Sequence, residues 1–161
     1  GKITLACDAC GKNLVGLWLE GQKYYQGTLK EALIEKDAVP LFDIAKKWLD
    51  RYFSGQKPDV AELPLAPQGN AFRQGVWEIL CTIPYGEVTT YGSIAKKMAV
   101  KLQKERMSSQ AVGGAVGHNP ISIIIPCHRV IGVNGSLTGY AGGIETKIKL
   151  LELEGVDMSG F

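Results

Sequence analysis

The chain has 161 residues, 45% of them hydrophobic, and its 18 basic and 16 acidic side chains give a formal net charge of +2. This composition excludes a disordered chain and allows one domain or two small ones. No apolar stretch is long enough to cross a membrane and no charged-then-apolar leader opens the sequence, so we expect no membrane partner. From residue 86 to 130 six basic side chains accompany two acidic ones, a pattern that fits either phosphate contacts or a solvated helix face.

The first third of the chain predicts a small α/β unit. Residues 3–7 and 14–19 are apolar and partly alternating, as strands are. Residues 54–70 contain three prolines and two glycines without any period and predict a linker. Between them, a helix that starts near Pro40 carries apolar residues at helical spacing: Leu41, Ile44, Ala45, Trp48, Leu49 and Tyr52.

Short helices are predicted after the linker. One apolar stripe covers residues 72–80. Hydroxyl side chains at residues 89–90 can cap a helix that runs from residue 91 to about residue 98, and those at residues 108–109 can cap the next helix, which runs to residue 117. Two short helices in tandem indicate a helix-turn-helix. The second contains three glycines, which a helix tolerates where something must approach its backbone closely.

The last part of the chain predicts a hairpin and a closing helix. Residues 130–133 and 136–138 flank Asn134-Gly135, a strong hairpin signal that would supply a wing. The closing helix carries Ile144, Ile148, Leu151 and Leu153. We therefore expect an α+β fold with an N-terminal supporting α/β domain, residues 1–66, and a C-terminal domain, residues 67–161.

The segment Ile-Ile-Ile-Pro-Cys-His-Arg-Val, residues 123–130, points most directly to chemistry. Neighbouring positive charge stabilises a thiolate and so activates a cysteine, and His128 and Arg129 directly follow Cys127. The alternative is a buried structural cysteine, although such a cysteine rarely lies between a proline and two polar residues. Because the motif needs a free thiol, we expect a reducing, cytoplasmic location.

Residues 126–130, Pro-Cys-His-Arg-Val, resemble the active-site motif of the O6-alkylguanine-DNA alkyltransferases, also called methylated-DNA–protein-cysteine methyltransferases. The resemblance is specific over residues 70–155 and implies a ribonuclease-H-like N-terminal domain and a C-terminal winged helix-turn-helix alkyltransferase domain. The flanking motifs that fit in register are Ile83-Pro84-Tyr85-Gly86-Glu87-Val88, Thr90-Tyr91, Gly113-Gly114-Ala115, Asn119-Pro120, Gly139-Tyr140 and Glu154-Gly155.

The function that this resemblance implies is DNA repair by direct transfer. Cys127 would take an alkyl group, such as methyl, from O6-alkylguanine in an irreversible, single-turnover reaction; O4-alkylthymine stays open as a second substrate. The base must first be flipped out, because the alkylated oxygen faces the stacked interior of the duplex. The implied partner is alkylated double-stranded DNA, bound through its minor groove by a monomer, with no cofactor and no metal.

The resemblance also implies roles for single residues. His128 would act as base toward the Cys127 thiol through a water, and Glu154 would orient the imidazole. Asn119 would hold the turn that presents the cysteine, and Tyr91 would donate a proton as guanine departs. Contacts to DNA or substrate are expected from a further set: Thr90, Ser109, Gln110, Ala111, Gly114, Arg129, Tyr140, Ala141 and Gly142.

Some of these contacts carry more specific expectations. Tyr140 resembles the residue that stacks near the flipped base, with Gly142 leaving room, and Arg129 is assigned a structural or electrostatic role rather than a catalytic one. Gln110 departs from the family, which usually has an arginine three residues before the Gly-Gly pair to fill the gap left by the base. Glutamine can hydrogen-bond the orphaned cytosine but carries no charge.

Four other kinds of protein or site fit the sequence less well: a zinc site, a protein phosphatase, a cysteine hydrolase and a binding module. Cys7 and Cys10 form a Cys-x-x-Cys pair, but a structural zinc needs about four ligands, and the remaining candidates are Cys81, His118 and His128. We expect no metal and interpret Cys7, Cys10 and Cys81 as incidental thiols. A protein phosphatase would need an arginine six positions after Cys127, where Val133 stands. The sequence contains no recognisable signature of a cysteine hydrolase. A non-catalytic module that only binds alkylated DNA would not need Cys127.

Overall fold

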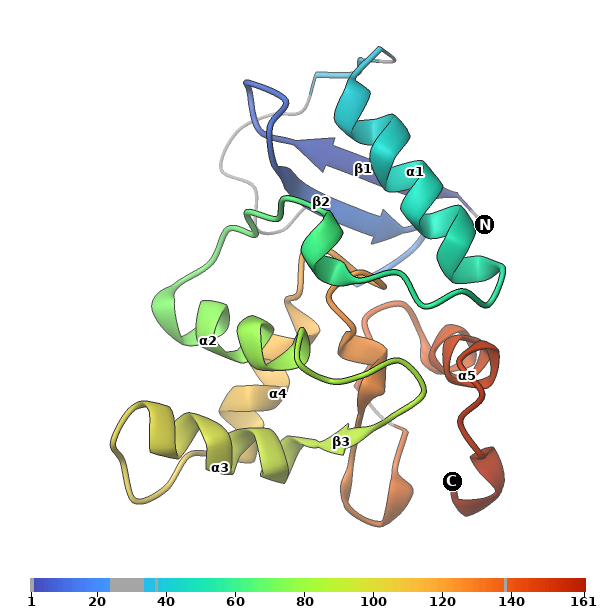
Figure 1. Cartoon of the computed structure of the whole chain (residues 1–161). Coiled ribbons are helices and arrows are strands. Elements are labelled where there is room, and N and C mark those ends of the chain that lie inside the picture. Colours follow the sequence, from blue (N-terminus) through green and yellow to red (C-terminus); the bar gives the residue numbers. More distant parts are fainter. Residues whose placement is uncertain (1, 24–33, 37, 138) are drawn as a thin grey trace.

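The computed structural model describes residues 2–23, 34–36, 38–137 and 139–161. Its N-terminal hairpin and first helix lie on top of a group of helices formed by the rest of the chain (Figure 1). Among the described residues, no helix combines the length and apolar character needed to cross a membrane.

The N-terminal part is a two-stranded antiparallel sheet covered by one helix. The two predicted strands form: β1 (Ile3–Cys7) pairs with β2 (Leu14–Leu19), and α1 (Pro40–Phe53) lies across them (Figure 1). The predicted stripe on α1 is confirmed except at Ile44, which is 51% exposed because it lies at the edge of the stripe. The buried residues of α1 are Leu41, Ala45, Trp48, Leu49 and Tyr52.

The predicted linker has more structure than its composition indicated. A 3₁₀ turn, Val60–Glu62, is closed by a capping box from Asp59. Beyond it the chain runs beside β2, where the Leu14 amide donates to the Pro64 carbonyl at 2.8 Å and the Ala66 amide to the Leu14 carbonyl at 2.8 Å. One turn and one bridge are too short to leave a periodic pattern in the sequence.

Four helices form most of the C-terminal part: α2 (Ala71–Leu80), α3 (Tyr91–Lys101), α4 (Ser109–Gly117) and α5 (Ile144–Leu153). The Thr90 and Ser108 side chains accept from amides in the first turns of α3 and α4, which confirms both predicted caps. Helix α3 runs three residues further than predicted, through the buried Ala99 and the exposed Val100 and Lys101.

The predicted wing hairpin forms its turn but not its ladder. Asn134 and Gly135 have φ values of 62° and 80°, as a tight hairpin turn requires, and the Gly132 amide donates to the Ser136 carbonyl at 2.6 Å. Among the described residues on either side of that turn, however, the expected strands do not pair. Instead β4 (Val130–Ile131) pairs in parallel with β3 (Thr89–Thr90), which ties the start of α3 to the segment after Cys127.

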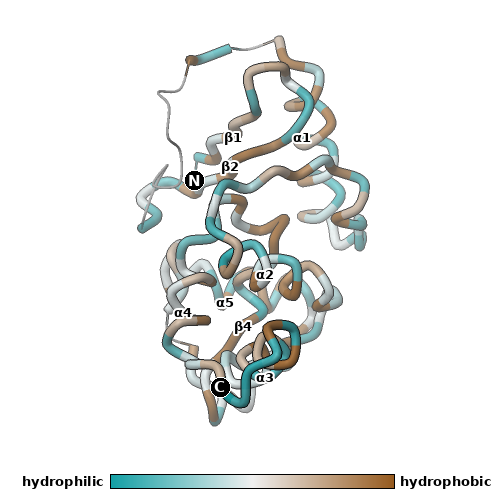
Figure 2. Tube along the Cα trace, turned by 90° about the vertical axis from the view of Figure 1, so that its left-hand side faces the viewer, coloured by the Kyte–Doolittle hydropathy of each residue, from teal (hydrophilic) through white to brown (hydrophobic). Residues whose placement is uncertain are grey.

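One hydrophobic core joins the two parts of the molecule. The tube of β2 is brown along much of its length (Figure 2), and the buried Leu17 of this strand belongs to the same cluster as Trp77 of α2. The backbone is also shared: the Leu17 amide donates to the Pro120 carbonyl at 2.8 Å, and its carbonyl accepts from the Ser122 amide at 3.0 Å. The N-terminal strand is therefore bonded directly to the segment that leads to Cys127.

Candidate active site

The segment before Cys127 turns sharply twice. Ile123 has a φ of 71°, which is uncommon for a β-branched residue, and around it the Ile124 amide donates to the Ser122 carbonyl at 2.8 Å. Pro126 lies in a second three-residue turn, across which the Cys127 amide donates to the Ile125 carbonyl at 2.8 Å. Cys127 then begins a short 3₁₀ helix, Cys127–Arg129.

Asn119 braces these turns from within. Its buried side chain donates to the Ile125 carbonyl at 2.8 Å and accepts from the Ile121 amide at 3.0 Å. A side chain that satisfies two backbone groups across six residues fixes the path between them. The structure thus brings Asn119 to the turn that the sequence analysis assigned to it.

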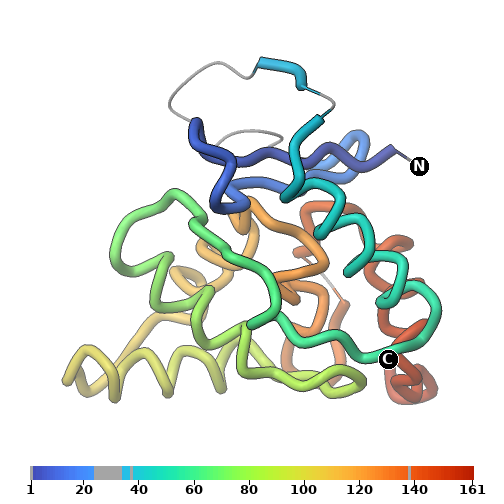
Figure 3. Tube along the Cα trace, turned by 45° about the horizontal axis from the view of Figure 1, so that its top comes forward, coloured from blue at the N-terminus to red at the C-terminus, as the bar shows by residue number. Residues whose placement is uncertain are grey.

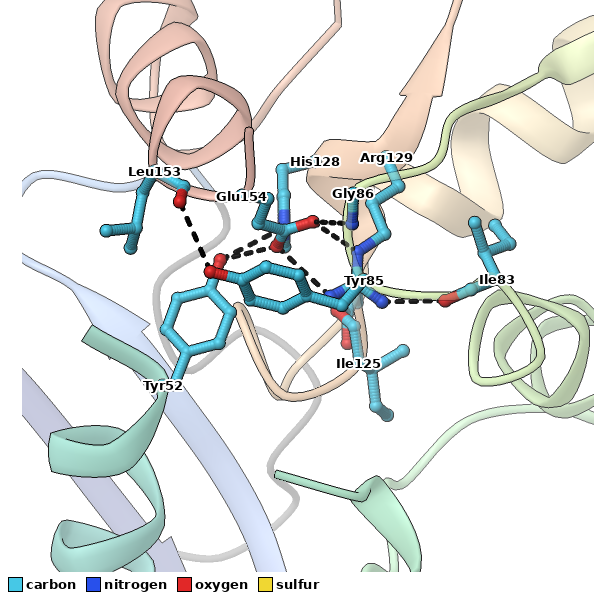
Figure 4. Close-up of polar contacts among 10 residues, drawn as sticks. Tyr52, Ile83, Tyr85, Gly86, Ile125, His128, Arg129, Leu153 and Glu154 are labelled. Atoms are coloured by element: carbon cyan, nitrogen blue, oxygen red, sulfur yellow. Dashed lines mark hydrogen bonds and ion pairs between the residues drawn. The ribbon is translucent and has the colours of Figure 1, made fainter. Parts of the chain in front are cut away.

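Glu154, which follows the last residue of α5, is the centre of a buried polar network (Figure 4). Its side chain is fully buried, so a carboxylate here needs several hydrogen bonds. Five reach it: Tyr52 Oη and His128 Nε2 at 2.5 Å each, Arg129 Nε at 2.8 Å, Arg129 Nη2 at 3.1 Å and the Gly86 amide at 3.1 Å. The donors come from three separate segments, α1, the loop before β3 and the turn after Pro126, which the carboxylate holds together.

The protonation states in this network follow from those contacts. Burial would raise the pKa of Glu154, but the hydrogen bonds from His128 and Arg129 outweigh it and bring the pKa down to about 2. Burial lowers the pKa of His128 against the pull of Glu154, so the imidazole is neutral at pH 7. Because Nε2 faces the carboxylate, Nε2 carries the proton and Nδ1 keeps its lone pair. Nδ1 is buried and accepts no hydrogen bond from the described residues.

Cys127 is 4% exposed, and its thiol is held in the neutral form. Burial raises its pKa, although a hydrogen bond from Asn119 and the positive charge of Lys147 act in the opposite direction. Burial and the electrostatic influence of Cys127 also raise the pKa values of Tyr91 and Tyr140, so both phenols lie within electrostatic range of the cysteine. The Tyr140 hydroxyl is buried and has no partner among the described residues.

The surface next to these tyrosines is hollowed. A pocket of about 380 Å³ is lined by Tyr91, Gly92, Ser109, Gln110, Gly113, Val133 and Gly139. A second of about 260 Å³ shares Gly113 and Gly139 and adds Lys23, Gly114, Gly117, His118, Tyr140 and Ala141. At Gly142 a Cβ would lie 2.6 Å from the Tyr140 ring, so glycine here leaves room for that ring.

The other predicted contact residues fall into two groups. Ser109, Gln110, Ala111 and Gly114 are exposed on α4, and Thr90 caps α3 with its hydroxyl group. Arg129, by contrast, is buried, and besides Glu154 it donates to the Ile83 carbonyl at 2.6 Å. Its guanidinium is therefore engaged inside the protein, and the structural or electrostatic role expected of it stays a prediction.

Both parts of the chain match models of one family. Residues 1–67 match 6-O-methylguanine DNA methyltransferase, ribonuclease-like domain, and residues 71–156 match 6-O-methylguanine DNA methyltransferase, DNA binding domain. The chain belongs to the 6-O-methylguanine DNA methyltransferase family. This confirms the resemblance and the two-domain fold class.

Known members of the 6-O-methylguanine DNA methyltransferase family are similar along nearly the whole chain. The methylated-DNA–protein-cysteine methyltransferase of Haemophilus influenzae is 44% identical over 96% of this chain and 80% of that protein. The enzyme of the same name from Methanosarcina acetivorans is 43% identical over 96% of this chain and 92% of that protein. A structure of Mycobacterium tuberculosis OGT in complex with DNA has a TM-score of 0.78 and 42% identity, over 94% of this chain and 85% of that one.

Three groups at the site of this family member were not predicted from the sequence: the Tyr52 hydroxyl, the Gly86 amide and Lys147. Tyr52 looked like one more residue of an apolar stripe, and a backbone amide leaves no signal. Lys147 is fully buried and donates to the Val130 carbonyl at 2.5 Å, and burial lowers its pKa to about 8. Its place among Ile144, Ile148 and Leu151 in the predicted closing helix was the available hint.

Proposed function

We propose that this protein repairs DNA by moving an alkyl group from O6 of guanine to Sγ of Cys127, irreversibly and once per protein molecule. The observation that carries the proposal is the pair of polar groups next to the buried cysteine. A neutral histidine follows the cysteine in the chain, its Nδ1 has no partner among the described residues, and an ionised carboxylate holds the other ring nitrogen. The relatives named above as methylated-DNA–protein-cysteine methyltransferases support it.

Each group then has a defined task in one displacement. The thiol proton passes to His128 Nδ1 through a water, a sulfur–carbon bond forms, and the bond between the alkyl carbon and O6 breaks. Guanine departs with a proton that Tyr91 donates to it. Since burial disfavours the thiolate, the proton is removed as the sulfur attacks rather than beforehand. The thioether has no easy leaving group, so the product is final.

The DNA contacts follow from the exposed face of α4. We infer that this helix enters the minor groove of the alkylated duplex, that the base flips toward Tyr140 and the two pockets, and that Gln110 fills the gap in the stack. Ser109, Ala111 and Gly114 would allow the close approach. The Mycobacterium tuberculosis OGT structure in complex with DNA supports DNA as the partner.

We infer a monomer that works in the cytoplasm, where its thiols stay reduced. We also place the domain boundary between residues 66 and 67, which is supported by family matches that end at residue 67 and resume at residue 71.

Mass spectrometry tests the proposed function directly. After incubation with duplex DNA that contains O6-methylguanine, the intact protein should gain one methyl group, and peptide mapping should place it on Cys127. With excess methylated DNA, repaired product should equal the protein present and not exceed it. A protein that stays unmodified, or product that exceeds protein, would contradict the proposal. The same assay with O4-methylthymine decides the second substrate.

A further inference from the structure

Tyr52 is the contribution of the N-terminal part to the buried network. It lies in the last turn of α1, whose C-terminal end comes close to α5 (Figure 3), and it is 1% exposed. Its ring stacks on Trp48 with centroids 5.9 Å apart and meets the rings of Tyr85 and His128 edge-on. The ring is thus fixed from several sides, which determines where the hydroxyl points.

That hydroxyl shares an acceptor with the histidine. Tyr52 Oη is 2.5 Å from Glu154 Oε2 and 3.4 Å from His128 Nε2 (Figure 4). Since Nε2 carries a proton that it gives to the same oxygen, the Tyr52 hydroxyl can only donate to Glu154. Two donors of different segments therefore converge on one carboxylate oxygen, and the position of one constrains the other.

We propose that Tyr52 is a positioning residue for alkyl transfer: its hydroxyl holds the Glu154 carboxylate in the orientation that aligns His128 with Cys127. The inference rests on the proposed function. It gives the N-terminal domain a part in the reaction beyond covering the core, because α1 supplies the Tyr52 hydrogen bond to Glu154. No described residue of the C-terminal domain offers a hydroxyl to that carboxylate.

The direction of the effect follows from the charges that face His128. These are the Glu154 carboxylate and the Lys147 ammonium from α5, the Arg129 guanidinium from its own turn and the neutral Tyr52 phenol from α1. Arg129 and Lys147 are unchanged when the Tyr52 hydroxyl is removed. The carboxylate then carries more charge toward Nε2, so the pKa of His128 rises. As the pH falls, the imidazole is therefore protonated, and lost as a base, at a higher pH than in the parent protein.

The decisive comparison is Tyr52→Phe against Tyr85→Phe. Both changes remove one hydroxyl from the same aromatic cluster, but the Tyr85 hydroxyl donates to the Leu153 carbonyl at 3.2 Å and not to Glu154. Single-turnover transfer from methylated duplex DNA at saturating protein should slow about tenfold in Tyr52→Phe, the scale expected for the loss of one hydrogen bond to a charged group. The acidic limb of its pH–rate profile should move to higher pH. Tyr85→Phe should leave that limb in place.

A variant of unchanged shape guards against a folding defect. Replacing Tyr52 with 3-fluorotyrosine keeps the ring and makes the hydroxyl a stronger donor, so the acidic limb should move to lower pH. Nitrogen NMR of His128 should show the matching change in its titration in both variants. If neither Tyr52 variant moves the acidic limb of the pH–rate profile or the titration of His128, the inference is overturned. The parent protein, measured alongside, keeps the two questions apart: methyl transfer to its Cys127 upholds the proposed function even where the Tyr52 inference fails.

Discussion

The two functional regions of this protein differ in how they are built. Around Glu154 every participating side chain is buried and nearly every polar atom has an internal partner, with donors from α1, the loop before β3 and the turn after Pro126. The outer face of α4 is the opposite: Ser109, Gln110 and Gly114 are exposed, and a Cβ at Gly114 would meet nothing within 4 Å.

This difference separates two kinds of side chain. The buried groups already have their orientation in the free protein, as electrostatic catalysis requires. The exposed groups on α4 acquire their geometry when DNA arrives. Substitutions in the buried network should therefore affect the transfer rate, the stability and the pH dependence together. Substitutions on α4 should affect only the binding and repair of duplex DNA.

The largest effect is expected at the nucleophile. Cys127→Ser should abolish transfer, because an alcohol at neutral pH is far less nucleophilic than an activated thiol, while fold and DNA binding persist. Cys10→Ser, at an exposed thiol of the same chain, is the matched control and should transfer at the parent rate. Single-turnover assays and intact mass measure both. Transfer by Cys127→Ser near the parent rate would refute the role of Cys127.

Glu154→Gln should affect both rate and stability. The amide cannot neutralise the buried Arg129, and breaking such a pair costs about 3–5 kcal/mol. It also cannot orient the imidazole in the same way, a loss worth roughly 10,000-fold in comparable triads. Glu152→Gln, at an exposed position on the same helix, is the control and should change neither. Urea unfolding and single-turnover rates test this, and a variant with parental stability would contradict the network as described.

Tyr91→Phe tests the border between the two regions, since Tyr91 begins α3, lines the pocket beside α4 and lies near Cys127. If its hydroxyl supplies the proton to guanine, the rate at saturating DNA should fall about 100-fold or more. DNA affinity, measured separately by fluorescence anisotropy, should change much less. An unchanged rate would leave Tyr91 as a packing residue.

The pH dependence of stability should reflect the buried network. The pKa of Glu154 falls from 4.5 to about 2 on folding, and that of His128 is also lowered from 6.5. Both groups bind protons more readily in the unfolded chain, so each stabilises the fold above its unfolded pKa and loses that contribution as pH falls. Stability should decline first below about 6.5 and again between about 4.5 and 2, the second step by about 3 kcal/mol. In Glu154→Gln, the free energy of unfolding measured with urea at different pH values should lack the decline between about pH 4.5 and 2.

The sequence predicted the elements that depend on near neighbours. Thr90 and Ser108 cap helices because their partners lie two or three residues away, and the stripe of α1 follows from the helical period alone. The family motif located Cys127, His128 and Glu154. Tyr52 was missed because its acceptor lies 102 residues further along the chain, and only the tertiary fold brings the two side chains together. The strand pairing of Val130 was missed for the same reason.

The smallest and most selective effect is expected at Gln110, on the exposed face of α4. Removing a side chain that fills the gap in the stack should slow repair of duplex DNA, where the base must be flipped, but not the reaction with free O6-methylguanine. Gln110→Ala should therefore lose several-fold to about tenfold in duplex repair alone. Gln110→Arg should repair duplex DNA at least as fast and bind it with a steeper salt dependence, because it adds a charge near the phosphates.

The contrast between the two substrates isolates the step of base flipping. A folding defect or a damaged nucleophile would slow both reactions equally, whereas a defect in flipping slows one. Gln56→Ala, the same change at an exposed position outside α4, is the control and should leave the ratio of the two rates at its parental value. Equal losses on duplex and free base in Gln110→Ala would show that Gln110 has no part in extrusion. The exposed face of α4 would then serve to dock the duplex, with the opening of the stack supplied by another part of the protein.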